Sequence, residues 1–211
     1  MATVALTSPQ PTDTLPPSPA TVVQDDFFLA QGIWSDCAYC TFRDGAFVFG
    51  PSPVSGIFLQ ELSICGSCGE PITYRMRVDA AYGEGETEPE RGFGLLLGWA
   101  EDHVLIVEIS PSQSIDVWRL GAGADAWVAG VDAWDWVGGI TSDAVNPRSP
   151  NHVEVAATRS EAGAIDIAIT VNGTLALVVT DQPADRGWVG LALFDHSLEA
   201  IFDNFEFEGF E

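Results

Sequence analysis

The chain of 211 residues contains no lysine, and arginine supplies all eight of its strongly basic side chains. They stand against 31 aspartates and glutamates, which gives a formal net charge of -23. Without lysine, the chain cannot form a P-loop, a Schiff-base nucleophile or an anchor for pyridoxal phosphate. Its negative field repels phosphate backbones and anionic lipids, so we expect no nucleic acid partner and no attachment to membrane surfaces.

Long apolar runs are missing as well. No stretch of about 20 apolar residues is present, so we expect no membrane insertion. The first residues lack the basic and apolar regions of a signal peptide. The acidity is nevertheless typical of exported or salt-tolerant proteins, with a specific cation-binding role as the alternative. We therefore favour an extracellular or cell-surface location, reached by another export route, from a cleaved precursor or within a larger parent protein.

The composition divides the chain into two parts. Residues 1–23 are rich in proline, threonine and serine and show no periodicity, which is typical of an extended linker. Such an arm can instead add a strand to a neighbouring molecule, so self-assembly through residues 1–23 is the alternative. Residues 24–211 form the predicted domain. The whole chain is 46% hydrophobic, with a mean hydropathy of +0.15, which is enough to bury a core.

The last quarter of the domain shows the clearest strand pattern. Between residues 164 and 181 apolar side chains recur at every second position, the period of a half-buried strand. Only Asn172-Gly173 interrupts them, and this dipeptide is a strong signal for a tight hairpin turn. Two more apolar runs follow at residues 188–194 and 200–207. The pattern predicts that the chain ends as an antiparallel meander.

Similar signals run through the rest of the domain. Residues 39–49 read as a hairpin turned at Asp44-Gly45, and residues 121–150 as long loops with one or two short strands. Further strands are expected at residues 56–62, 72–80, 92–99, 104–109 and 115–120. No window shows a convincing amphipathic helix. About a dozen short strands with turn signals every 8–12 residues predict an all-β, two-sheet antiparallel sandwich.

Several segments, in this order, resemble a known superfamily. They are an opening DDF, a DGAF hairpin, the strand RGFGLLLGW, the VNG hairpin, the strand GWVGLAL and a closing FDNFEF. Residues 25–207 resemble the concanavalin A-like lectin/glucanase superfamily, and within it the bacterial laminin-G-like jelly rolls related to keto-disaccharide hydrolase-type domains. The resemblance implies a jelly-roll sandwich whose first and last strands lie side by side. It also implies glycan or protein binding, adhesion or, in some members, glycoside cleavage.

Four cysteines form two C-x-x-C pairs, Cys37/Cys40 and Cys65/Cys68, separated by 24 residues. The spacing predicts that the four meet in space, and it matches tetrahedral thiolate coordination of a structural zinc. Two disulfides, as in exported proteins, are the alternative, and free or redox-active thiols a third. Four cysteine ligands would leave no open position, so we do not expect a catalytic zinc.

The resemblance also suggests a structural calcium where the first and last strands meet. Asp203, with Asp26 and Asn204, lies at the matching positions, and hard oxygen ligands suit Ca²⁺. The alternative is that Asp203 accepts hydrogen bonds from backbone N–H groups at a strand end. No organic cofactor is expected.

Glycosidases of the superfamily carry alternating carboxylates on a strand of the concave face. Glu84, Glu86, Glu88 and Glu90 alternate in this way. The neighbouring glycines and Pro89 argue against a strand, because glycine weakens pairing and proline lacks a donor. We interpret the segment as a solvated acidic loop, with a weak cation site as the alternative.

Seven tryptophans are many for one domain. An exposed indole can stack on the C–H face of a pyranose ring, which is the usual basis of sugar binding. We identify four candidate ligand-binding residues in or beside the irregular segment, namely Trp118, Trp127, Trp134 and Trp136. Packing in the core or in loops is the alternative, and it is the interpretation for Trp99 and Trp188.

No catalytic motif is evident. The three histidines, His103, His152 and His196, show no metal-binding spacing, and no Gly-x-Ser-x-Gly sequence occurs. The sequence therefore favours a non-catalytic, lectin-like carbohydrate-binding or adhesion module, whose partner is a glycan or a surface protein. A structural subunit of an extracellular assembly and a glycoside hydrolase of the same superfamily are the alternatives.

Overall fold

The computed structural model describes residues 21–27, 39–51, 58–61, 73–83, 92–99, 104–120, 134–160, 164–182, 189–194 and 197–210. Within these ranges the chain forms strands in two antiparallel sheets, as the sequence predicted. The strands are β1 (Thr21–Asp25), β2 (Cys40–Arg43), β3 (Ala46–Phe49), β4 (Phe58–Glu61), β5 (Thr73–Tyr82), β6 (Phe93–Trp99), β7 (Val104–Ile109), β8 (Ser114–Leu120), β9 (Trp134–Thr141), β10 (Asn151–Arg159), β11 (Ile165–Val171), β12 (Thr174–Gln182), β13 (Gly190–Leu193) and β14 (Ala200–Phe210). No helix in these ranges has the length and apolar character needed to cross a membrane.

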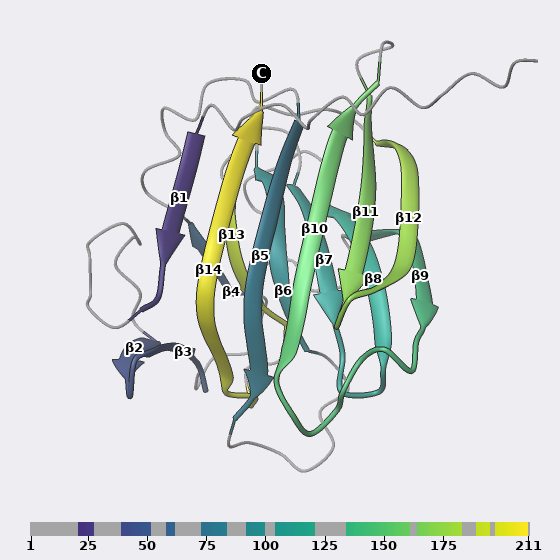
Figure 1. Ribbon diagram of the computed structural model, residues 1–211. Coiled ribbons are helices and arrows are strands. Elements are labelled where there is room, and N and C mark those ends of the chain that lie inside the picture. Colours follow the sequence, from purple (N-terminus) through teal and green to yellow (C-terminus); the bar gives the residue numbers. More distant parts are fainter. Residues whose placement is uncertain are drawn as a thin grey trace, which may run out of the picture.

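The larger sheet has eight strands in the order β12-β11-β10-β5-β14-β3-β2, and β1 also pairs with β14 (Figure 1). First and last strands therefore lie side by side, as the resemblance implied. Their register runs from Thr21 opposite Gly209 to Asp25 opposite Phe205. β1 begins within the segment 1–23 that we expected to be a linker, whereas residues 1–20 lie outside the described ranges.

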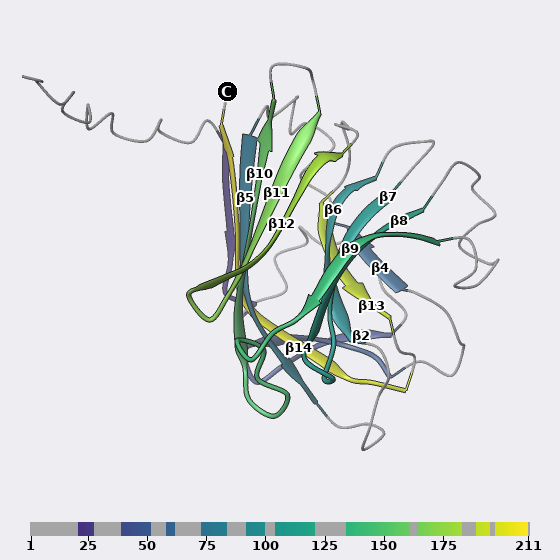
Figure 2. The ribbon, with the colours of Figure 1, turned by 90° about the vertical axis from the view of Figure 1, so that its right-hand side faces the viewer.

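The smaller sheet has six strands in the order β4-β13-β6-β7-β8-β9 and packs against the first (Figure 2). The inner faces of the two sheets enclose the core. On β5, for example, Tyr74, Met76 and Val78 are buried, while the residues between them are partly exposed. Phenylalanines of β3, β6 and β14 fill the interior, and burying one such ring contributes about 1.5–3 kcal/mol.

Two predicted hairpin turns are present. Asp44 and Gly45 connect β2 to β3, and Asn172 and Gly173 connect β11 to β12, all four with positive φ. Asn and Asp tolerate this backbone region better than other side chains, and glycine adopts it freely. These local signals were sufficient because a two-residue turn fixes its own strand pairing.

The predicted closing meander is wrong. β11 and β12 form a hairpin in the eight-stranded sheet, but β13 crosses to the other sheet, between β4 and β6. β14 then returns to the first sheet, beside β5. The reason lies in the sequence of β13, Gly-Leu-Ala-Leu, whose four residues are all buried. Such a strand needs cover on both faces and a neighbour at each edge, and the centre of the six-stranded sheet provides both.

Candidate functional site

The face of the six-stranded sheet that points away from the core carries tryptophans and carboxylates on three adjacent strands. Ile115 and Val117 of β8 are buried in the core, so Asp116 and Trp118 project from the opposite face. We call this face, formed by β7, β8 and β9, the outer face of the six-stranded sheet. Glu108 lies directly opposite Asp116 across β7 and β8, and Trp136 lies opposite Trp118 across β8 and β9.

Each of these tryptophans donates a hydrogen bond to one of these carboxylates. The Nε1 atom of Trp118 lies 2.8 Å from Oε2 of Glu108, and Nε1 of Trp136 lies 2.9 Å from Oδ1 of Asp116. In both pairs the acid stands one strand away and two residues along, the diagonal relation that long side chains can bridge. The two indole–carboxylate pairs thus repeat the same arrangement across three strands.

Glu108 is the buried member of this arrangement. Its exposed fraction is 3%, and its second oxygen, Oε1, accepts a hydrogen bond from the backbone N–H of Gly92 at 3.1 Å. Burial raises the pKa of the nearby Tyr82 hydroxyl, and the charge of Glu108 raises it further. Tyr82 therefore remains protonated and can donate to the carbonyl of Ile109 at 3.1 Å. The hydrogen bonds from Trp118 and Gly92 fix the orientation of Glu108.

The carboxylate of Asp116 occupies space that a glycine on the neighbouring strand leaves open. Gly139 of β9 is its cross-strand partner, and a Cβ atom there would lie only 2.1 Å from Oδ1 of Asp116. The absence of a side chain leaves the space that the carboxylate occupies. The other oxygen, Oδ2, has no hydrogen-bond partner among the described residues and remains available as an acceptor.

Trp136 provides the accessible aromatic surface. Its side chain is 59% exposed although its N–H group is bonded, whereas Trp118 is partly buried. An indole anchored through its edge keeps its apolar face open to solvent and loses little freedom when something stacks on it. Together with the free oxygen of Asp116, this face can bind a molecule that has both an apolar face and hydroxyl groups.

The structure brings together two of the four predicted tryptophans. Trp118 and Trp136 lie on the outer face, whereas Trp127 and the side chain of Trp134 lie outside what the structure describes. The sequence interpretation missed the two carboxylates. A usable signal was present, because each acid interrupts an apolar strand, VLIVEI in β7 and SIDVWRL in β8.

Comparison with known proteins identifies the fold. No family model and no curated protein sequence matches the chain. Among solved structures it is similar to the carbohydrate-binding module CBM66 from Bacillus subtilis, with a TM-score of 0.56 and 12% identity over 83% of this chain and 91% of that one. The alginate lyase Aly36B gives a TM-score of 0.55 and 11% identity, covering 92% and 99%. The lumenal domain of VIP36, in its Ca²⁺- and Man3GlcNAc-bound form, gives 0.54 and 12%, covering 85% and 84%.

The chain has the concanavalin A-like jelly-roll fold. At these identities the likeness shows the jelly roll alone, because one fold supports many unrelated sites. The function must therefore be argued from the residues on the sheets.

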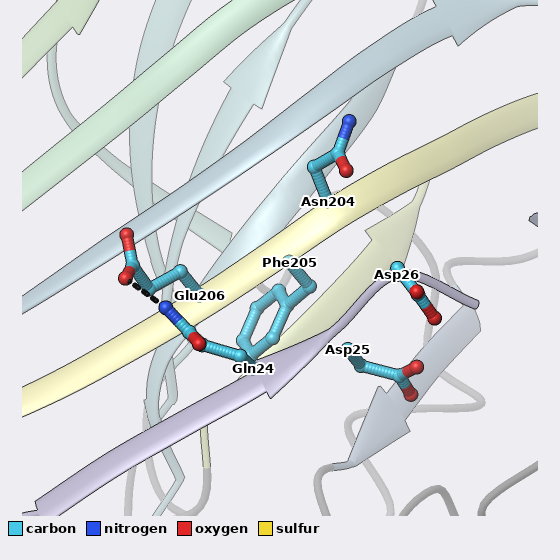
Figure 3. Close-up of a pocket in the computed structure, with 6 residues that line it drawn as sticks. All are labelled: Gln24, Asp25, Asp26, Asn204, Phe205 and Glu206. Carbon is cyan, nitrogen blue, oxygen red and sulfur yellow. Dashed lines mark hydrogen bonds between the residues drawn. The ribbon is translucent and has the colours of Figure 1, made fainter. Parts of the chain in front are cut away.

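The predicted calcium ligands lie near the edge where β1 meets β14 in the jelly roll. A shallow pocket of about 280 Å³ there is lined by Gln24, Asp25, Asp26, Asn204, Phe205 and Glu206 (Figure 3). Asn204, however, points away from Asp26, and its Nδ2 atom donates to Asp79 at 2.9 Å. Asp203 accepts a hydrogen bond from the backbone N–H of Asn204, and it does not line the pocket.

In the described ranges, no three His, Cys, Asp or Glu side chains are grouped to hold a metal ion. The calcium site of the jelly roll therefore stays a prediction.

The cysteine site lies mostly outside the described ranges, as Cys37, Cys65 and Cys68 are not among them. Cys40 begins β2 and is disulfide-bonded. A sulfur in a disulfide cannot act as a thiolate ligand, which favours the disulfide alternative over zinc. Elemental analysis combined with thiol titration tests both.

The remaining candidates take no part in the outer face. The alternating Glu84, Glu86, Glu88 and Glu90 lie outside the described ranges, as do His103 and His196. His152 lies on the other sheet, where its Nδ1 atom is 2.7 Å from Oδ1 of Asp79.

Proposed function

We propose that the chain is a non-catalytic, lectin-like carbohydrate-binding module that binds glycans on the outer face of the six-stranded sheet. The observation that carries the proposal is the exposed indole of Trp136, held by Asp116 with its ring face open. Rigid aromatic surfaces of this kind stack on the C–H faces of sugar rings, while carboxylate oxygens accept bonds from sugar hydroxyls. The similar structures include a carbohydrate-binding module, which supports the proposal.

One observation favours glycoside cleavage as a second candidate. Glu108 and Asp116 face each other on adjacent strands, and retaining glycosidases use two carboxyl groups about 5–5.5 Å apart. Against this, both oxygens of Glu108 already accept hydrogen bonds within the protein, from Trp118 and Gly92. A buried carboxylate held in this way is poorly placed to donate a proton to a leaving group. Binding is therefore the better-supported function.

Finer features of the proposal follow the family resemblance. A laminin-G-like adhesion role, an extracellular location and a structural calcium all agree with the jelly-roll fold. A structural subunit that uses residues 1–23 for contacts remains the other alternative. It predicts that deleting those residues converts an assembly into monomers, as measured by light scattering.

Affinity electrophoresis and calorimetry with a panel of soluble polysaccharides test the proposed function. We expect millimolar to micromolar affinity for at least one polysaccharide. Trp136→Ala should abolish binding, and Trp134→Ala tests the second candidate on β9. Ile140→Ala is the matched control, because Ile140 is 44% exposed on the same strand and lies opposite Ile115 of the core face. Equal affinity of W136A and the wild type would overturn the proposal, and release of sugar products would favour the hydrolase.

A further inference from the structure

The charge of the outer face sets it apart from a general sugar platform. The six strands of its sheet contain a single basic residue, Arg119. Arg119 follows Trp118 directly, so it projects from the opposite face, and its Nη2 atom is 3.5 Å from Asp135. Asp116 lies on the outer face beside Trp136, and the indole N–H group bonded to it carries no charge.

Asp116 has two separate effects at this place. Through Oδ1 it holds the edge of the Trp136 indole, which fixes the plane on which a ring can stack. Through its charge it makes the surroundings of that plane negative, and its oxygen Oδ2 has no hydrogen-bond partner among the residues that the structure describes. A ligand stacked on Trp136 therefore meets a carboxylate within reach of its own substituents. An acidic substituent at that position would be repelled, whereas a hydroxyl or ammonium group would be bound.

We infer that Asp116 is a positioning and specificity-determining residue that restricts the outer face to neutral or ammonium-bearing glycans and rejects uronate and sulfate sugars. The inference rests on the proposed function, since it assumes that Trp136 is the binding platform. It separates this chain from the similar alginate lyase, whose name states that it acts on an acidic polysaccharide. The rest of the chain adds to the effect, because its formal net charge of -23 repels polyanions at long range.

Glycan binding provides the first test. The probes are hydroxyethylcellulose and dextran, each paired with its anionic derivative, carboxymethylcellulose or dextran sulfate, at low ionic strength. We expect the wild type to bind a neutral member and to bind its anionic derivative at least fivefold more weakly, as one repulsive contact would produce. Asp116→Asn keeps an acceptor for Trp136 but removes the charge. The preference for the neutral polysaccharide over its anionic derivative should therefore fall about fivefold. Asp116→Ala also removes the anchor and should weaken neutral binding.

The control and a second measurement separate the two proposals. Asp135 directly precedes Trp136 on β9, so its side chain projects from the opposite face of the sheet. Asp135→Asn should therefore leave the preference for neutral polysaccharides unchanged. Quenching of Trp136 fluorescence, taken as the difference between wild type and Trp136→Phe, needs no glycan. Relative to its quenching of free N-acetyltryptophanamide, iodide should quench Trp136 less than caesium does, and Asp116→Asn should narrow that gap.

Each outcome decides one of the proposals. If no polysaccharide binds but the quenching gap is present and narrows in D116N, the proposed function fails while the charge selectivity of the face stands. If the wild type binds a neutral polysaccharide and its anionic derivative equally well, the inference is overturned and the proposed function stands. Equal quenching by iodide and caesium, each taken relative to free N-acetyltryptophanamide, would overturn the inference as well.

Discussion

The outer faces of the two sheets hold their acidic side chains in different ways. On the eight-stranded sheet, Arg77 of β5 bonds to Glu154 of β10 at 2.9 Å and to Glu206 of β14, and its guanidinium lies 3.2 Å from Glu208. Arg75 adds weaker contacts at 3.5 and 3.8 Å. Every acid in this group has a cation beside it.

On the six-stranded sheet, Glu108 and Asp116 each accept a hydrogen bond from an indole N–H group. An indole is a donor without charge, so the hydrogen bond from Trp136 leaves the negative charge of Asp116 in place. The comparison shows that one face pairs its acids with arginines across neighbouring strands, whereas the other presents the carboxylate of Asp116 beside an exposed indole. We therefore expect the largest stability changes from mutations on the first face, and changes in binding from mutations of Trp136 and Asp116 on the second.

Breaking the charge cluster of the eight-stranded sheet should have the largest effect. Arg77→Met keeps much of the aliphatic side chain but leaves Glu154, Glu206 and Glu208 close together without their shared cation. We expect the free energy of unfolding to fall by about 2 kcal/mol, as for a partly buried group that loses its partners. Urea unfolding measures it. Arg148→Met, at an exposed position, is the control, and equal losses in the two variants would contradict the prediction.

A smaller loss is expected from the buried pair on the other sheet. Trp118→Phe keeps an aromatic ring but removes the donor to Oε2 of Glu108, whose exposed fraction is only 3%. A buried carboxylate that loses a hydrogen bond costs about 1–2 kcal/mol. Adding Glu108→Gln should recover part of that loss, because the amide carries no charge. A double variant that is less stable than W118F alone would contradict this account of the Trp118–Glu108 hydrogen bond.

The smallest effect concerns pH. Burial by itself would raise the pKa of Glu206, but hydrogen bonds from Gln24 and Arg77, with the charges of Arg77 and Arg75, outweigh it and lower that pKa. A folded-state pKa below the ordinary 4.5 means that ionised Glu206 stabilises the fold above pH 4.5, and that this contribution disappears as pH falls through the folded value. Glu206→Gln should therefore flatten the stability profile below pH 4.5.

The matched variant for this pH prediction comes from the six-stranded sheet. Asp135 has a side chain that is 70% exposed and a single 3.5 Å contact with Arg119. Exposed pairs of this kind contribute little to stability. We expect Asp135→Asn to reproduce the wild-type profile of unfolding free energy between pH 3 and 6, and an equal flattening in both variants would remove the role assigned to Glu206.

Local patterns predicted much of this architecture and less of the site. Alternation in β5 and the Asn-Gly turn between β11 and β12 were visible because each depends on neighbours in sequence. The sheet change at β13 was not visible, since an apolar tetrapeptide does not specify which strands will flank it. Trp136 could be proposed from composition, but its partner Asp116 depends on the register of β8 and β9.

That register contains an irregularity between Val117 and Trp118, where Val137 has no partner of its own. A shift of this kind changes which residues share a face. No spacing rule in the sequence predicts it, so the two indole–carboxylate pairs could be identified only once the strands had been placed.

The pairing of β1 with β14 has a mechanical consequence. Thr21 and Gly209 are partners at one end of this ladder, so the chain enters and leaves the jelly roll at neighbouring points (Figure 1). A force that pulls the two ends of the chain apart would act on the Thr21–Gly209 end of the β1–β14 pairing. The hydrogen bonds between the two strands would then break one after another from that end. We expect the domain to yield at low force by releasing β1 first. The same closeness suits it to insertion within a longer polypeptide, where it would add little to the distance between the flanking segments.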